Sequence, residues 1–331
     1  MKHSPHSRRQ TVARAGLLLL FICLLTGCEY KDLCYDHHTH AAQLHVSFNW
    51  QKAPNHTAKS MTVLFYNMDK PSQQPIRYDY PLTGGTATLE PGRWRAVTYN
   101  NDTETILYRN MGDEDAIEAY TRQSSIEEGT QLSRAGMPRA DGTEAEPVIL
   151  EPDPLWGCAS EAFDLQVNEH DAELVLYPEP RFQTITIDII NVPNLQYTGS
   201  FGGAVSGLAA SRFMASGTVS EQKATQAFSI SRAGETTLRM TMNVFGHCPH
   251  LSEGVGNEHL LTVYAILADG TKWYYTIDVT DKIHEASQQA TEGGDISITV
   301  DGLPVPKPIV NGSGFKPTID GWQGVEIEVG M

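Results

Sequence analysis

The chain has 331 residues, with 24 basic and 40 acidic side chains and a formal net charge of −16 at pH 7. This balance argues against a nucleic-acid-binding protein, because an acidic surface repels phosphates. At about 100 to 200 residues per domain, the length predicts two domains, and five cysteines do not make the disulfide framework of a small secreted protein.

The first 27 residues have the features of a signal peptide. Four basic side chains and no acid precede an apolar run at residues 15–25, which is too short to span a bilayer. The run leads into LTGC at residues 25–28, which resembles the lipobox of bacterial lipoproteins. The resemblance implies cleavage between Gly27 and Cys28 and acylation of Cys28, with palmitate among the acyl chains. Several acyl chains hold a protein on a membrane. The alternative is an ordinary secreted protein with a chance cysteine.

Residues 28–41 are predicted to be a polar tether behind the lipid. In an extended chain, four potential ligands of zinc or copper would project to one side: Cys34, Asp36, His38 and His40. A second group, His247-Cys248-Pro249-His250, could add ligands. Ligands at alternate positions of one strand rarely converge without a turn, so a tether is favoured, and no metal or other cofactor is expected.

The rest of the chain has the period-two alternation of half-buried strands. The alternating positions are Leu44 to Trp50, Ile185 to Ile189, Leu238 to Val244, Ile296 to Val300 and Val325 to Val329. Turn signals separate them: residues 83–86 read TGGT, and Asp269-Gly270 predicts a tight hairpin between residues 259–268 and 272–280. Short helices are expected at residues 113–121 and 281–290. The pattern predicts an all-β protein of antiparallel sandwiches.

Residues 122–147 differ in composition, since Ser, Thr, Glu, Gly and Ala dominate there, and they are predicted to form a long mobile loop. We place a domain boundary near residue 158. The predicted organisation is therefore a signal peptide (1–27), a lipidated tether (28–41), an N-terminal β-sandwich domain (42–158) and a C-terminal β-sandwich domain (159–331).

Enzymatic motifs find little support in the sequence. There is no G-x-S-x-G elbow and no phosphate-binding loop, and GVGNEH at residues 254–259 lacks the third glycine of a dinucleotide fingerprint. Acidic clusters at 113–115 and 127–128 could form a carboxylate pair or a calcium site, although solvated loops are the simpler explanation. Four tryptophans could stack on sugars but are more typical of core or interface positions: Trp94, Trp156, Trp273 and Trp322. We predict that the protein is not an enzyme.

Five segments together resemble the fimbrillin-like lipoproteins of Bacteroidales, a family that includes pilins and pilus anchor proteins. They are TLEPGRWRAVTYNNDTETILYRN (88–110), SGLAASRFMASG (206–217), NVFGHCPH (243–250), LADGTKWYYTIDVTDKI (267–283) and GSGFKPTIDGWQGVEIEVGM (312–331). The resemblance extends over nearly the whole mature chain. The resemblance implies two tandem transthyretin-like antiparallel β-sandwich domains, in agreement with the strand pattern.

The resemblance also implies how such a protein assembles. In the family, an arginine-specific protease removes the lipidated end with the first strand, and a strand from the next subunit fills the groove. An open sheet edge offers unpaired N–H and C=O groups, which a donated strand satisfies. In this chain, no arginine occurs between Glu29 and Ile76, and the first is Arg77. Trimming would have to cut deep inside the first domain, which favours a subunit that stays lipidated.

The sequence therefore predicts a non-enzymatic fimbrillin-like surface lipoprotein, a structural subunit or membrane anchor of a fimbria (pilus) that contributes to cell adhesion. Its expected partners are other fimbrillin-like subunits, joined by strand addition, and the outer membrane, joined through the lipid on Cys28. Acids just after that cysteine, Glu29 and Asp32, resemble the signal that sends such lipoproteins to the cell exterior. The alternatives are a solitary surface lipoprotein that binds a glycan or host ligand, and a hydrolase or metal-binding protein.

Overall fold

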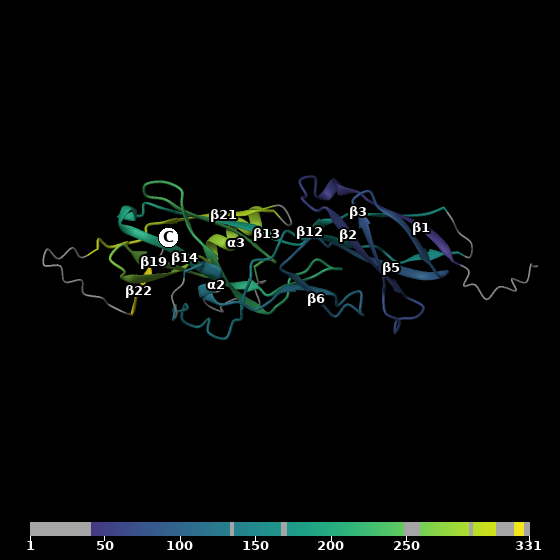
Figure 1. Ribbon diagram of the computed structural model, residues 1–331, viewed down its shortest axis with the longest axis horizontal. Coiled ribbons are helices and arrows are strands. Elements are labelled where there is room, and N and C mark those ends of the chain that lie inside the picture. The colour runs from purple at the N-terminus through teal and green to yellow at the C-terminus, as the bar shows by residue number, and fades with distance from the viewer. Residues whose placement is uncertain are drawn as a thin grey trace, which may run out of the picture. The chain divides into compact units, whose positions relative to one another are not determined.

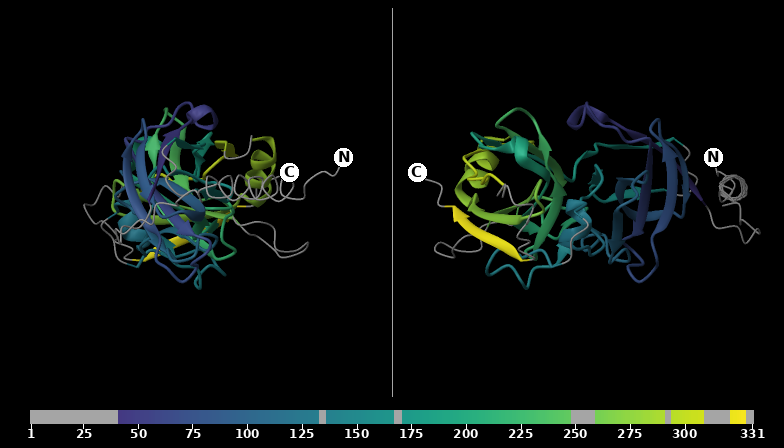
Figure 2. Two further views of the ribbon diagram at one scale, coloured as in Figure 1. Left: turned by 90° about the vertical axis from the view of Figure 1, so that its right-hand side faces the viewer. Right: turned by 60° about the vertical axis from the view of Figure 1, so that its left-hand side comes forward.

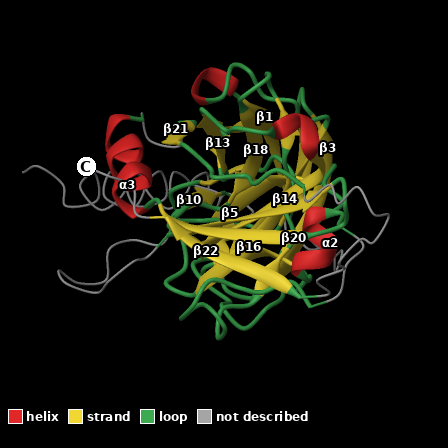
Figure 3. Ribbon diagram, turned by 90° about the vertical axis from the view of Figure 1, so that its left-hand side faces the viewer, coloured by secondary structure: helices red, strands yellow, loops and turns green. Residues whose placement is uncertain are grey.

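The computed structural model describes residues 41–132, 136–166, 171–247, 259–290, 294–308 and 321–327. Residues Ala41–Met331 form one compact unit. Strands dominate the described residues, and the helices among them are short (Figure 3). The predicted all-β sandwich class is therefore confirmed, while the transthyretin-like subtype stays a prediction. No helix within these ranges combines the length and apolar character needed to cross a bilayer.

Two sheets enclose a first core. Their strands are β1 (Ala42–Phe48), β2 (Ser60–Asn67), β3 (Ile76–Pro81), β4 (Gly85–Leu89), β5 (Gly92–Asn100), β9 (Trp156–Ala159), β10 (Phe163–Leu165), β11 (Ala172–Leu176) and β12 (Glu179–Pro180). One sheet has the order β11-β1-β4 and the other β12-β9-β5-β2-β3, with β10 also on β5 (Figure 1). Leu44 and Leu176 from the first sheet pack with Phe65 and Trp94 from the second. Burial of these large side chains is the main stabilising term of this sandwich.

Two further sheets enclose a second core. Their strands are β8 (Val148–Ile149), β13 (Gln183–Ile190), β14 (Thr198–Ala209), β16 (Lys223–Ser229), β17 (Ser231–Arg232), β18 (Leu238–Val244), β19 (Leu260–Leu267), β20 (Lys272–Asp278), β21 (Ile296–Asp301) and β22 (Trp322–Ile327). The orders are β17-β18-β13-β21 and β22-β20-β19-β14-β16-β8. Ile187, Met240, Val263 and Ile298 share this core. The strand β22, yellow in Figure 2, lies at the edge of its sheet.

A small fifth sheet joins segments from distant parts of the chain. It has the order β15-β7-β6, from β6 (Ile106–Arg109), β7 (Glu118–Thr121) and β15 (Ser211–Phe213). The buried carboxylate of Glu118 accepts hydrogen bonds from Arg109 at 2.5 and 2.7 Å and from the hydroxyl of Ser211. Hydrogen bonds to Glu118 on β7 thus link this strand to both β6 and β15.

Most of the period-two positions lie in strands as predicted. The prediction is wrong for Trp50, which begins the 3-10 helix η1 (Trp50–Lys52), and Val329 lies outside the described residues. Strand β1 alternates buried and exposed residues, and β13, β18 and β21 bury every second residue. The predicted hairpin joins β19 and β20 in antiparallel register, with Gly270 at φ +89°. Gly84, at φ +84°, is required in the TGGT turn because a Cβ there would lie 1.9 Å from the carbonyl oxygen of Val46. Local turn chemistry was therefore readable from sequence.

Of the two helices predicted from the sequence, the structure contains one. The prediction at residues 281–290 is confirmed by α3 (Thr280–Gln289). The prediction at residues 113–121 is wrong, because residues 118–121 form β7 instead. Asp113 closes only a turn there, accepting backbone hydrogen bonds from Ala116 and Ile117. Pairing on both sides, with β6 and β15, outweighs the weak local helical preference.

The stretch 122–147 differs from the expected open loop. It contains α2 (Ile126–Thr130), whose N-cap Ser125 accepts a hydrogen bond from the backbone N–H of Glu128. Ile126, Leu132 and Met137 are buried against the second set of sheets. Ser125 and Glu128 form the S-x-x-E pattern of a capping box, which indicates the start of a helix. A local sequence signal for this helix was therefore present.

The predicted division near residue 158 stays a prediction. Strands β10, β11 and β12, which follow that residue, pair with β5, β1 and β9 in the first pair of sheets. Strand β8, which precedes it, pairs with β16 in the second pair. The chain therefore crosses between the two sandwiches more than once. The short 3-10 helices η1 (Trp50–Lys52) and η2 (Leu195–Tyr197) complete the described elements.

Candidate functional site

The site residues predicted near the N-terminus lie outside the described residues. These are Gly27 and Cys28 for cleavage and lipidation, and Cys34, Asp36, His38 and His40 as metal ligands. Their roles stay predictions.

Strand β1 is the first described element and is firmly packed in its sheet. It lies between β11, to which it is parallel, and β4, to which it is antiparallel. Leu44 is 1% exposed and Val46 is fully buried. Arg77 lies beyond it in β3, where its guanidinium donates to Asp79 at 3.1 Å. A cut after Arg77 would therefore remove β1 together with β2 and divide β3.

The outer edge of β11 faces a groove. Strand β11 is terminal in its sheet, and the groove beside it measures about 560 Å³. Phe163, Leu174, Val175 and Tyr177 line it, and the last two are 42% and 38% exposed. A terminal strand offers N–H and C=O groups to an added strand, and this apolar lining offers positions for its side chains.

Cys158 also lines this groove and is the free thiol among the described residues. Burial raises the pKa of the Cys158 thiol to about 11. The thiol is therefore protonated at neutral pH, and it behaves as a small apolar side chain rather than as a nucleophile.

The C-terminal strand β22 pairs within its own chain. It runs parallel to β20 along six residues, from Trp322 opposite Lys272 to Ile327 opposite Ile277. The ring of Trp322 contacts that of Tyr264 with centroids 5.5 Å apart. This strand is a resident one in the structure, although it occupies a sheet edge.

The tryptophans are placed as the simpler interpretation predicted. Trp94 and Trp156 are 1% and 5% exposed, and both belong to hydrophobic clusters. Trp273 and Trp322 are partly buried against core clusters. Buried rings cannot stack on a sugar from solution.

The acidic clusters have local structural roles. Glu127 accepts hydrogen bonds from the backbone N–H groups of Gly136 and Met137, at 3.1 and 3.5 Å. Glu128 pairs with Arg122, and Asp115 accepts from Arg95 at 2.6 Å. These carboxylates fix loop conformation and ion pairs, and they do not form a matched catalytic pair with each other.

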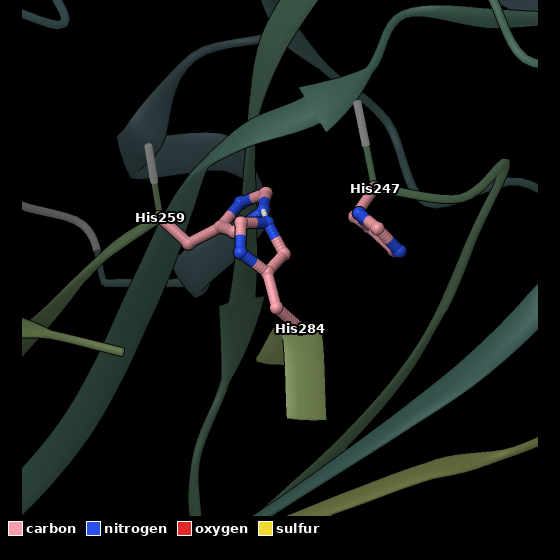
Figure 4. A group of neighbouring side chains, drawn as sticks. All are labelled: His247, His259 and His284. Carbon is pink, nitrogen blue, oxygen red and sulfur yellow. Dashed lines mark hydrogen bonds between the residues drawn. The ribbon is translucent and has the colours of Figure 1, made fainter. Parts of the chain in front are cut away.

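Three histidines from separate elements converge beside the second core. His247 follows β18, His259 precedes β19, and His284 lies on α3. Each offers one ligand atom, and these atoms all lie within 4.8 Å of one another. Figure 4 shows His259 and His284 facing each other, with His247 beside the pair. The Nε2 atoms of His259 and His284 are 3.2 Å apart.

Irregular backbone brings these rings together. The ladder between β14 and β16 shifts register between Val205 and Leu208. Within this shift, the carbonyl oxygen of Ser206 lies 3.2 Å from Nδ1 of His259, and the hydroxyl of Ser206 accepts from the N–H of Leu260 at 2.9 Å. A carbonyl only accepts hydrogen bonds, so Nδ1 of His259 carries the proton in this tautomer.

Burial sets the charge of His259. His259 is fully buried, and this desolvation, with smaller contributions from His247 and His284, lowers the pKa of His259 to about 3. The imidazole is neutral at physiological pH. Sequence reasoning singled out His247 but missed His259 and His284, because no recurring spacing links the three.

Comparisons with known proteins place the chain in a wider group. A family profile described as a domain of unknown function, DUF5119, matches residues 27–229. A Bacteroides ovatus protein named "Putative fimbrium anchoring subunit Fim4B" is 23% identical over 338 residues, covering 93% of this chain and 96% of that protein.

Solved structures share the fold. A crystal structure of a "putative adhesin" from Bacteroides ovatus has a TM-score of 0.59 at 21% identity and covers 86% of this chain and 99% of that chain. Another, of "putative polysaccharide binding proteins (DUF1812)" from Bacteroides thetaiotaomicron, has a TM-score of 0.51 at 8% identity and covers 80% and 92%. None of these names describes an enzyme.

The family profile spans more than half of the chain, and the full-length relative carries a fimbrial name. The resemblance to fimbrillin-like proteins seen in the sequence is thereby confirmed. The chain belongs to the DUF5119 family.

Proposed function

We propose that this protein is a non-enzymatic fimbrillin-like surface lipoprotein that serves as a structural subunit or membrane anchor of a fimbria and contributes to adhesion. The observation that carries the proposal is the similarity to the Bacteroides ovatus protein named "Putative fimbrium anchoring subunit Fim4B", which extends over 93% of this chain. Such an extent makes a shared architecture, and with it a shared role, the simplest explanation.

The arginine pattern supports an anchor. Since Arg77 is the first arginine after the lipobox and lies in β3, an arginine-specific cut would remove Leu44 and Val46 from the first core. A donated strand would then have to replace β1 and also part of the neighbouring sheet. A subunit that keeps β1, the tether and the lipid on Cys28 avoids this loss.

The edge of β11 supports a partner-binding role. We propose that a strand of another fimbrillin-like subunit adds there and that the exposed side chains of Val175 and Tyr177 contact it. The buried positions of Trp94 and Trp156 give the alternative, a solitary glycan-binding lipoprotein, less support. The proposed location is the outer membrane, with the protein facing the exterior.

Mass spectrometry of the protein taken from its own cell surface tests the anchor. The expected result is a chain that begins at an acylated Cys28 and is digested by protease added to intact cells. Replacement of Cys28 by alanine should release the protein into the medium, whereas Cys34→Ala should leave it on the cell. A mature chain that begins beyond β1 would contradict the anchor.

Site-specific photocrosslinking tests strand addition. A photoreactive residue at position 175 should crosslink to another subunit in assembled fimbriae. The control position is Glu235, which is exposed in the turn before β18. Equal crosslinking from both positions, or none from position 175, would overturn the assignment of β11 as the accepting edge.

A further inference from the structure

The cluster of His247, His259 and His284 has a geometry that the fimbrial role does not use. The three side chains come from a strand end, a strand start and a helix, and they meet at the edge of the second core. Two of the three imidazoles are buried, and three imidazole nitrogens so close together form a set of ligands that suits a transition-metal ion.

We propose that His247, His259 and His284 form a binding site for a divalent transition-metal ion of the zinc type, with a water molecule as fourth ligand. Imidazole nitrogen suits zinc, and three protein ligands with one open position form a common zinc arrangement. The assignment is independent of the fimbrial function proposed above.

The distance between two of the ligands already fits the ion. Zinc binds histidine nitrogen at about 2.0 to 2.1 Å with tetrahedral angles, so two such nitrogens lie about 3.3 to 3.4 Å apart. The Nε2 atoms of His259 and His284 are 3.2 Å apart. Little movement of either ring is needed to receive the metal between them.

The third ligand stands at the solvent side. His247 is only partly buried, and its ring centroid is 5.7 Å from that of His259 and 5.4 Å from that of His284. Its ligand atom lies within 4.8 Å of the other two, so a modest rotation of an accessible side chain closes the site.

Supporting groups hold the ligands as metal sites require. Metal-bound histidines usually donate their second ring N–H to a carbonyl or another acceptor. Nδ1 of His259 faces the carbonyl oxygen of Ser206 at 3.2 Å, which leaves its Nε2 lone pair directed toward His284. Nε2 of His247 lies 2.8 Å from the hydroxyl of Ser287, which follows His284 by three residues on the same face of α3.

Two arrangements agree with the 3.2 Å separation of the Nε2 atoms of His259 and His284. One is a metal ion bound between them. The alternative is a metal-free pair in which Nε2–H of His284 donates to Nε2 of His259. That arrangement joins two of the rings, whereas a metal ion would join all three.

Zinc titration of the full chain, purified without an affinity tag, tests the site. Isothermal calorimetry should show one more bound equivalent for the natural protein than for His247→Ala or His284→Gln. The matched control is His45→Ala, which removes an exposed histidine in β1 and should bind like the natural protein. The histidines of the tether are present in all four proteins, so their contribution cancels.

A variant that keeps all three ligands provides a second test of zinc binding. Ser287→Ala leaves all three ligands in place, and loss of a supporting hydrogen bond should weaken zinc binding about 10-fold to 100-fold. Zinc should also raise the thermal unfolding temperature of the natural protein but not that of His247→Ala. If His284→Gln fails to fold, the partly buried His247 still provides the test. Equal stoichiometry and affinity in His247→Ala and His45→Ala would overturn the proposal.

Discussion

Replacement of Leu44 by alanine tests whether β1 is a packed and permanent part of the first sandwich. Leu44 is 1% exposed, and its direct neighbours across the sheet are Ala172 on β11 and Ala87 on β4. Both neighbours are small and neither can expand into a void. The cavity left by the substitution should therefore remain open.

The expected cost follows from this packing. Removing three buried carbon atoms loses about 2.4 kcal/mol of transfer free energy. The uncollapsed cavity adds to this, so the free energy of unfolding should fall by about 3 to 5 kcal/mol. With a urea m-value of about 2 to 3 kcal/mol per molar, the unfolding midpoint should shift by about 1 to 2.5 M.

The assay is urea unfolding followed by tryptophan fluorescence, with buried Trp94 of the same core as a reporter. The matched control is His45→Ala, which alters an exposed side chain one residue along the same strand and should change stability by less than about 0.5 kcal/mol. Equal midpoints for the two variants would refute the packing of β1 and remove the structural argument for an anchor that keeps this strand.

Three further predictions concern other parts of the fold. Gly84 and Gly142 have nearly equal φ angles of +84° and +83°, but only at Gly84 would a Cβ meet backbone; Gly84→Ala should therefore unfold at a clearly lower temperature than Gly142→Ala. Hydrogen bonds from Arg109 lower the pKa of Glu118. This pair therefore stabilises the folded protein above the pKa of the unfolded carboxyl group, and its contribution is lost as the pH falls through the lower pKa of the folded state. Arg109→Met should lower the free energy of unfolding at pH 7 and make that free energy less dependent on pH in the acid range. Tyr264→Phe removes a 2.6 Å hydrogen bond to a loop carbonyl and should cost about 1 kcal/mol, with faster proteolysis of that loop; unchanged cleavage would show that the loop is held by other contacts.

Much of the fold was readable from local patterns. Alternation at Leu44 to Trp50 predicted β1, although the strand ends at Phe48, and alternation at Ile185 to Ile189 predicted β13. Asp269-Gly270 predicted a hairpin that the structure confirms. These signals are local because side chains in a strand alternate between faces and because a glycine permits positive φ in a tight turn. The fimbrillin-like resemblance was likewise carried by short segments in a fixed order.

Tertiary structure decided what distant residues do together. No local pattern announces that β1 pairs in parallel with β11, more than a hundred residues later, or that β7 takes the place of an expected helix. His259 began a predicted hairpin strand and His284 lay in a predicted short helix, but nothing in either local pattern marked the two as metal ligands. Ser206, within the register shift of β14, contacts His259, and α3 brings His284 to the same place. The periodicity of a segment shows which of its faces is buried. Whether side chains from separate elements meet depends on how those elements pack, and this packing is set by many long-range contacts together.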